Sequence, residues 1–173
     1  SLSSSGDEPD TFADHRALLD AGLCDAVVIA SPNFEHESTV LDGLDADVHL
    51  LIEKPLCTTA EACRRVIAAA EHSDRVVWVG LEYRYMPPVA RLAEEVHSQT
   101  NTGPVTLLSI REHRFPFLVK VGDGNRFNRY TGGTLVEKCC HFFDLMRHLT
   151  QSEPVRIYAS ASAQHNHQDE RYP

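Results

Sequence analysis

The sequence predicts an α/β protein that contains part of a doubly wound parallel sheet, followed by the start of an α+β domain with a largely antiparallel sheet. Three short apolar runs, at 26–30, 48–52 and 76–80, are separated by segments with helical spacing. Such runs are typical of parallel strands that are buried on both faces. After about residue 86, apolar and polar residues alternate in two segments, which is typical of strands with one buried face.

Local signals mark the helices of the first half. Gly22 ends an amphipathic helix, and helical spacing resumes at 35–43, after the first apolar run. Thr58 and Glu61 fit a capping box, as N-cap and N3 residues, for a helix that runs to about His72. Helices therefore connect the predicted strands at the short spacing that a doubly wound sheet requires.

The character of the chain changes at Met86, where we place a domain boundary between residues 1–86 and 87–173. The expected elements of the second part are, in order, a helix at 89–97, a strand at 105–114, a loop at 115–130, a helix at 134–149 and a strand at 155–163. The last ten residues are polar and are expected to fray.

Composition narrows the class of protein. The formal net charge is -9, which argues against nucleic acid or an anionic membrane as the main partner, because both would be repelled. No apolar run approaches the roughly 20 residues of a membrane-spanning helix, and the polar N-terminus does not resemble a signal peptide. Five cysteines without a C-x-x-C pair favour a reducing compartment. We therefore expect a cytoplasmic protein that acts on a small molecule.

Polar and charged side chains follow all three predicted parallel strands. Because parallel strands end at one edge of the sheet, where ligands bind in such folds, these residues are candidates for a site. They are Ser31, Pro32, Asn33 and His36 after the first strand, Glu53, Lys54 and Pro55 after the second, and Glu82, Arg84 and Tyr85 after the third. The alternative, a polar strand end with a rigid turn at 53–55, has about equal weight on spacing alone.

The predicted helix at 134–149 follows Gly132-Gly133 and carries Glu137, His141 and Asp144 on one face. Acidic and imidazole groups on an otherwise apolar helix need a reason, because burying them without partners is costly. Catalysis, with His141 as acid or base, is one reason, and a metal site is a second, although no further ligand cluster is visible. A structural polar network is the third, and the helix alone slightly favours it.

Taken in order along the chain, these motifs resemble the Gfo/Idh/MocA oxidoreductases, the family of glucose–fructose oxidoreductase and inositol dehydrogenase. The similarity includes Ser31-Pro32-Asn33 with His36, Glu53-Lys54-Pro55, Arg84 with Pro87, and Gly132-Gly133 before Glu137 and His141. It runs from about Asp25 to Leu149. Glu-Lys-Pro alone has little specificity, but its combination with the turn upstream and the helix downstream is specific.

The resemblance implies that residues 1–86 are part of a Rossmann-type domain that binds NAD or NADP. It implies that residues 87–173 begin a C-terminal α/β domain whose open sheet supports a homo-oligomer, a dimer or a tetramer. The implied reaction is hydride transfer between the nicotinamide ring and a carbinol or carbonyl of a sugar, cyclitol or related polyol. No metal is implied.

The resemblance also implies roles for single residues. Lys54 would assist at the substrate hydroxyl, His141 would take or return its proton, and Glu137 stands where the family usually has Asp. The residues expected to line the cofactor are Ser31, Pro32, Asn33, His36, Glu53 and Arg84, and those expected to contact substrate are Asn125, Arg126 and Asn128.

The chain departs from the family pattern because it has no G-x-G-x-x-G motif. We therefore expect a fragment of a longer enzyme, which by itself would not bind a dinucleotide in the family manner. A relative that keeps the fold for binding or assembly, without catalysis, is the alternative. Joint retention of Lys54 and His141 favours the enzyme.

Overall fold

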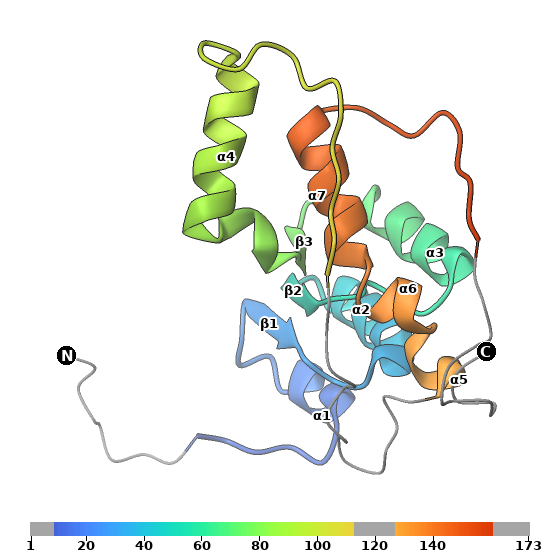
Figure 1. The fold of residues 1–173 in the computed structure, drawn as a ribbon. Helices are drawn as coiled ribbons and strands as arrows, with labels where there is room; N and C mark the ends of the chain where they lie inside the picture. The colour runs from blue at the N-terminus through green and yellow to red at the C-terminus, as the bar shows by residue number, and fades with distance from the viewer. Residues whose placement is uncertain (1–8, 113–126, 161–173) are drawn as a thin grey trace.

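The computed structural model describes residues 9–112 and 127–160. Figure 1 shows the three short strands at the centre of the molecule, with helices around them. The elements are, in order, α1 His15–Asp20, β1 Ala26–Ile29, the 3-10 helix η1 Asn33–Glu35, α2 His36–Asp45, β2 His49–Glu53, α3 Ala60–Ala70, β3 Val77–Gly80, the 3-10 helix η2 Glu82–Tyr85, α4 Pro87–Ser98, α5 Asn128–Thr131, α6 Thr134–Glu137 and α7 Cys140–Thr150. All three predicted parallel strands and the helices between them are confirmed.

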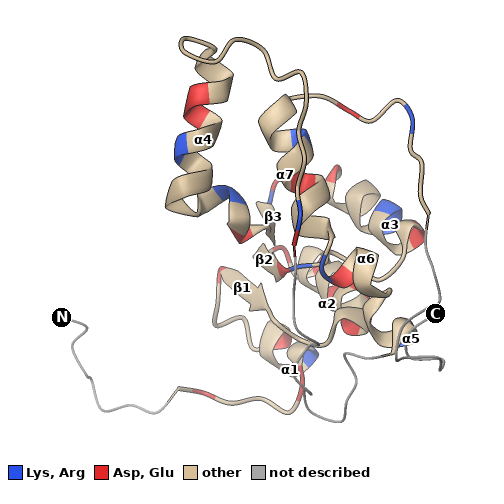
Figure 2. Cartoon of the chain, viewed as in Figure 1, with Lys and Arg blue, Asp and Glu red and all other residues tan. Residues whose placement is uncertain are grey.

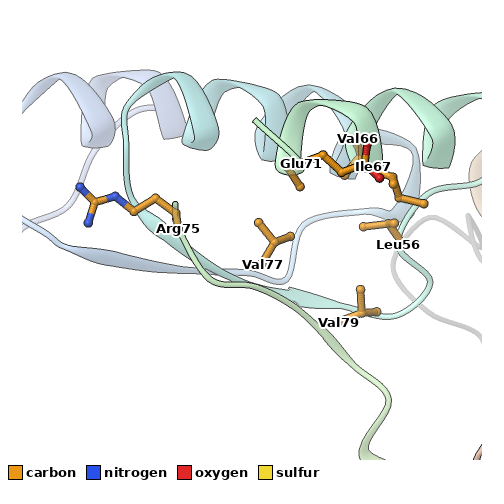
Figure 3. A pocket seen from close by; sticks show the side chains of 8 residues that line it. Leu56, Val66, Ile67, Glu71, Arg75, Val77 and Val79 are labelled. Carbon is orange, nitrogen blue, oxygen red and sulfur yellow. The ribbon is translucent and has the colours of Figure 1, made fainter. Parts of the chain in front are cut away.

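The strands form one parallel sheet in the order β1-β2-β3. Helices α2 and α3 lie on the same face of this sheet (Figure 3), as right-handed crossovers between consecutive parallel strands require. The core lies between that face and the two helices. Ile52, Val40 and Val66 have at most 1% of their surface exposed, and they pack with Ile29 and Leu50.

The opposite face of the sheet is open. Val28, Leu51 and Trp78 lie side by side across the three strands, and they are 67%, 43% and 50% exposed. Strands buried on both faces were the expectation, and it is wrong for this chain. Side chains alternate along a strand, so only every second residue faces α2 and α3.

The N-cap of α3 is Thr59, whose hydroxyl accepts a hydrogen bond from the Ala62 amide at 3.2 Å. The predicted cap at Thr58 is therefore wrong by one residue. Two adjacent threonines precede the helix, and either could satisfy an amide of the first turn. Thr59 has the extended backbone that is typical of an N-cap, and it leads directly into α3.

The second half is built on α7, which packs against α4 and η2. The structure assigns no strand to 105–112 or to 155–160, although both alternate in sequence. Val155, Ile157 and Tyr158 are more than 80% exposed. A strand needs a hydrogen-bonded neighbour, and these two segments have none within the described residues, so the antiparallel sheet stays a prediction, as does the domain boundary near Met86.

Among the described helices, none has the length and apolar sequence that a membrane crossing requires.

Candidate functional site

Lys54 extends from the carboxyl end of β2 to the second half of the chain. Its ammonium group donates a hydrogen bond to the backbone carbonyl oxygen of Glu137, with an Nζ–O distance of 3.0 Å. The preceding residue, Glu53, accepts the Lys54 amide on its carboxylate at 3.2 Å. Lys54 therefore joins the edge of the parallel sheet to the segment after Gly132-Gly133, as the site expected from the sequence requires.

The Glu137 carbonyl is available to Lys54 because the predicted helix at 134–149 is broken. The structure divides it into α6 and α7, and the Cys139 amide bonds back to the Thr134 carbonyl oxygen at 3.1 Å. In a continuous helix the amide of residue 141 would occupy the Glu137 carbonyl. The expectation of one continuous helix, with Glu137 and His141 on a single face, is therefore wrong.

His141 lies in the first turn of α7 and is 2% exposed. The Tyr83 ring stacks on its imidazole, with centroids 4.0 Å apart and planes 8° from parallel. An acid lies close to the ring: Oε1 of Glu82 is 3.6 Å from His141 Nε2. His141 Nδ1 is buried and has no hydrogen-bond partner among the described residues.

The environment of His141 favours its neutral form. Burial lowers the pKa of His141 most, and the positive charges of Lys54 and Lys138 lower it further, whereas Glu82 and Asp144 oppose this shift. A lowered pKa leaves the imidazole unprotonated at neutral pH, which is the state that can accept a proton. The influence of Lys54 also indicates that its ammonium group and the imidazole belong to the same site.

Arg84, expected on the cofactor side, is bound to Asp144 instead. Its guanidinium contacts both carboxylate oxygens, with Nε 2.6 Å from Oδ2 and Nη2 against Oδ1. Asp144 is 6% exposed, so the pair links η2 to α7 in a largely buried place. Arg84 therefore holds α7 against η2. Asp144 pairs with Arg84 and does not orient His141.

His36 is buried completely, at the start of α2. Its Nδ1 lies 2.8 Å from the carbonyl oxygen of Pro55, and its Nε2 lies 3.0 Å from that of Ser31. The ring therefore connects the loops after β1 and β2, and its polar atoms face the backbone, not a cofactor.

Ser31, by contrast, keeps a side chain without a partner. Its hydroxyl oxygen is buried, and no described residue forms a hydrogen bond with it. A buried polar group without a partner is costly and needs an explanation, such as a missing ligand or water. Asn33 and Pro32 follow it directly, and Asn33 begins η1. This end of β1 is thus suited to a polar ligand.

Two glycines fix the approach to α6. Gly132 has a φ of +79°, and a Cβ there would lie 2.6 Å from the Thr58 carbonyl oxygen. Gly133 has a φ of +83°, and a Cβ there would lie 2.9 Å from Oδ1 of Asn128. Asn128 thus packs next to the site, whereas Asn125 and Arg126 lie outside the described residues.

An apolar hollow of about 360 Å³ lies elsewhere, between α3 and β3 (Figure 3). Its lining residues are Leu56, Val66, Ile67, Ala70, Glu71, Arg75, Val77 and Val79, and they include no predicted site residue. Across the ranges 9–112 and 127–160, no group of three or more His, Cys, Asp or Glu side chains could hold a metal ion.

Two residues near His141 were not among the predicted site residues: Tyr83, which stacks on its ring, and Lys138, whose charge acts on it. Lys138 follows Glu137 in the turn between α6 and α7, and its ammonium group donates to the Tyr83 hydroxyl at 2.5 Å. Their spacing gave no signal, because the two residues come from distant segments and meet only in the fold. The one local sign was a charged Glu137-Lys138 pair between the apolar pairs Leu135-Val136 and Cys139-Cys140.

A family model described as an oxidoreductase family with an NAD-binding Rossmann fold, GFO_IDH_MocA, matches residues 4–81. This match, over residues 4–81, supports membership of the chain in the Gfo/Idh/MocA oxidoreductase family. Inositol 2-dehydrogenase/D-chiro-inositol 3-dehydrogenase of Halalkalibacterium halodurans is 42% identical over 79 residues, which cover 45% of this chain and 23% of that protein. The rhizopine catabolism protein MocA of Rhizobium meliloti is 28% identical over 93% of this chain and 49% of its own length.

A solved structure agrees with this fold. Levoglucosan dehydrogenase, in a complex with NADH and levoglucosan, matches with a TM-score of 0.64 at 22% identity, over 80% of this chain and 38% of that one. The chain thus spans less than half the length of each of these three proteins.

Proposed function

We propose that the natural protein carrying this chain is an NAD(P)-dependent oxidoreductase, which transfers a hydride between the nicotinamide and a carbinol or carbonyl of a sugar, cyclitol or related polyol. The contact between Lys54 Nζ and the Glu137 carbonyl oxygen supports this proposal most directly. That contact brings an ammonium group to the segment that carries a buried histidine with a lowered pKa.

The chain's own groups account for the proton in this reaction. When a carbinol is oxidised, its carbon loses a hydride and its oxygen loses a proton. A ring nitrogen of neutral His141 would accept that proton, and the Lys54 ammonium would stabilise negative charge on the oxygen. Glu137 is a positioning residue in this scheme, because its carbonyl holds Lys54. In the reverse direction, protonated His141 returns the proton.

The residues at the strand ends fit a polar cofactor. The buried Ser31 hydroxyl without a partner, with Pro32, Asn33 and Glu53 beside it, would hold the dinucleotide. The nicotinamide supplies a hydride acceptor or donor when it is bound. His36 and Arg84 are assigned to positioning, because their polar atoms are occupied by the backbone and by Asp144.

A polyol substrate is proposed from the relatives, two of which are named as inositol dehydrogenases of H. halodurans and Paracoccus denitrificans. Asn128 is the described residue that we assign to substrate contact, because its amide group lies against Gly133 at the entrance to α6. The expected homo-oligomer and the choice between NAD and NADP stay predictions.

Cofactor binding tests the proposal first. Trp78 is the only tryptophan and is half-exposed on the open sheet face, so quenching of its fluorescence by NADH or NADPH reports binding. The titration is made on residues 1–173 and on a version extended at its N-terminus with the natural sequence. We expect binding by the extended protein. If a folded extended protein binds neither cofactor, the proposal fails and a non-catalytic role takes its place.

Turnover with a panel of inositols and sugars tests the roles of the two side chains. His141→Ala is expected to lower kcat by roughly 10²- to 10⁴-fold, because the proton acceptor is lost. Lys54→Ala is expected to lower kcat by about 10²-fold or more. His72→Ala, at the exposed end of α3, is the matched control and should leave kcat unchanged. Equal kcat values for His141→Ala and the control would contradict the assignment.

A further inference from the structure

Lys138 is a lysine in an unusual place. Only 9% of its surface is exposed, although burying an ammonium group is costly unless it is paired. Its Nζ donates to the Tyr83 hydroxyl at 2.5 Å and lies 3.7 Å from Oε1 of Glu112. The same ammonium group is 4.9 Å from the centroid of the Tyr83 ring. Lys138 is thus fixed mainly against one side chain, Tyr83.

Tyr83 transmits this constraint to His141. Its ring lies parallel to the imidazole with a centroid distance of 4.0 Å, which is van der Waals contact over the whole face of the smaller ring. Tyr83 belongs to η2 and His141 to α7, so the two backbones do not determine the stacking by themselves. Because the hydroxyl of Tyr83 is bound by Lys138, the ring cannot rotate away without breaking that hydrogen bond.

Charges from four segments surround the imidazole. Glu82 of η2 lies 3.6 Å from Nε2, and Lys54 and Lys138 act on the ring from the loop after β2 and from the turn before α7. Asp144 lies on α7 itself, but both of its carboxylate oxygens are bound by Arg84. Glu82 is therefore the acid that can stabilise an imidazolium, and the two lysines oppose it.

We infer that Tyr83 and Lys138 are positioning residues for His141: Tyr83 fixes the plane of the imidazole, and Lys138 fixes Tyr83 through its hydroxyl and adds a positive charge to the site. The inference rests on the proposed function, because these tasks matter for catalysis only if His141 exchanges the substrate proton. Neither residue touches the reacting atoms in this scheme.

The pH dependence of kcat/KM in the natural protein tests this inference. Lys138→Met keeps the length of the side chain but removes the charge and the donor. His141 is then easier to protonate, so the acidic limb of the profile moves to higher pH. We expect a loss of about tenfold near pH 6 and a clearly smaller loss near pH 8. Lys138→Arg restores a cation and a donor, and it should return the profile toward that of the wild type.

Tyr83 variants separate the ring from its hydroxyl. Tyr83→Phe keeps the stacking surface and loses the bond to Lys138, whereas Tyr83→Leu loses both. We expect kcat to fall in the order wild type, Phe, Leu, with KM nearly unchanged, because only the geometry of the proton acceptor is altered. A kcat for Tyr83→Phe equal to that of the wild type would overturn the role of the hydroxyl bond, and equal falls for both variants would overturn the role of the stacked ring.

An NMR titration of the His141 ring protons gives a readout that does not need turnover. The resonance is assigned with His141→Asn, and the midpoint is compared between the wild type, Lys138→Met and Lys138→Arg. A higher midpoint in Lys138→Met alone supports the inference. Equal midpoints in all three, with parallel pH profiles, overturn it. If the wild type turns over no polyol while the midpoint still moves, the proposed function fails and the contact described here stands.

Discussion

Residues 9–98 and residues 127–160 are held in the molecule by different kinds of interaction. The first region has an apolar core, in which Ile52, Val40 and Val66 are closed off between the sheet and two helices. The second region has α7, which buries Leu145 and Leu149 but reaches the first region through several directional polar contacts as well. Arg84 binds Asp144, Lys54 binds the Glu137 carbonyl, and His97 Nε2 lies 2.8 Å from the carbonyl oxygen of His148.

The two kinds of interaction have different effects: one stabilises the fold, and the other determines the geometry of the site. Apolar burial is non-directional and scales with area, so it stabilises the first region without specifying a single docking position for the second. Hydrogen bonds and ion pairs are directional, and they determine where α6 and α7 lie relative to the strand ends. Figure 2 shows charged residues of both signs spread over the exposed surfaces of α1, α3 and α4, where ion pairs contribute little.

A charge placed in the core should produce the largest loss of stability, because the apolar core holds the first region together. Ile52→Asp puts a carboxylate where the exposed fraction is 0%, and we expect a loss of more than about 4 kcal/mol in the free energy of unfolding. Urea denaturation followed by circular dichroism measures this loss.

Leu51→Asp is the matched control for Ile52→Asp, one residue away on the open face of the same strand. It should cost about 1 kcal/mol or less in residues 1–173. A cost equal to that of Ile52→Asp would show that the open face is covered in solution.

Loss of the Arg84–Asp144 pair should have the next largest effect and act on the second region. Arg84→Met leaves Asp144 largely buried and unpaired. We expect a loss of about 2 to 3 kcal/mol, less than for a fully buried pair because Arg84 is still about a third exposed. Arg147 is on the same helix and forms an exposed pair with Glu153, which lies just after the helix; Arg147→Met removes this pair and should cause no measurable loss. Equal effects would mean that the first pair does not dock α7.

Loss of the N-cap of α3 should have a smaller effect on the free energy of unfolding. Thr59→Ala removes the side chain that accepts from the Ala62 amide, and we expect a loss of about 1 kcal/mol. Thr58→Ala changes the same atoms one residue earlier, so the difference between the two variants tests the observed cap against the cap predicted from the capping box. A larger loss for Thr58→Ala would favour the predicted cap.

Mild acid should weaken the second region by the smallest amount. Burial and nearby lysines lower the pKa of His141 in the folded protein, so the unfolded chain binds the proton more readily. This contribution to stability is present above the usual histidine pKa of about 6.5 and is lost as pH falls through the lowered folded value. Urea denaturation at a series of pH values below neutrality measures the slope, and His141→Asn should flatten it. Identical slopes would exclude His141 as its source.

The elements that could be predicted from the sequence are those whose signal is local. Runs such as 26–29 and 49–53 are β-branched and apolar, and the crossover rule then places consecutive strands in one parallel sheet. The ends of parallel strands meet at one edge, so the meeting of Lys54 with the segment before His141 could be predicted from the motifs and their resemblance to a family.

The remainder depends on contacts between distant residues. Nothing in the spacing indicates that Arg84 selects Asp144 as its partner, or that Tyr83 stacks on His141. The break after Glu137 is another case, because helical periodicity continues through it while Lys54 takes the carbonyl that the helix would use. The alternating segments at 105–112 and 155–160 form no strand within the described residues for a similar reason: a pattern predicts which face is buried, but not whether a partner strand is present.

Gly132 has a consequence for the way this protein can vary in nature. Every other amino acid has a Cβ, and at this position that atom would lie 2.6 Å from the Thr58 carbonyl oxygen on a backbone with positive φ. No mutation of this codon that changes the residue is then tolerated by itself. An inherited change at 132 can persist only together with a second change that moves the backbone near Thr58, so the two segments must evolve as one unit.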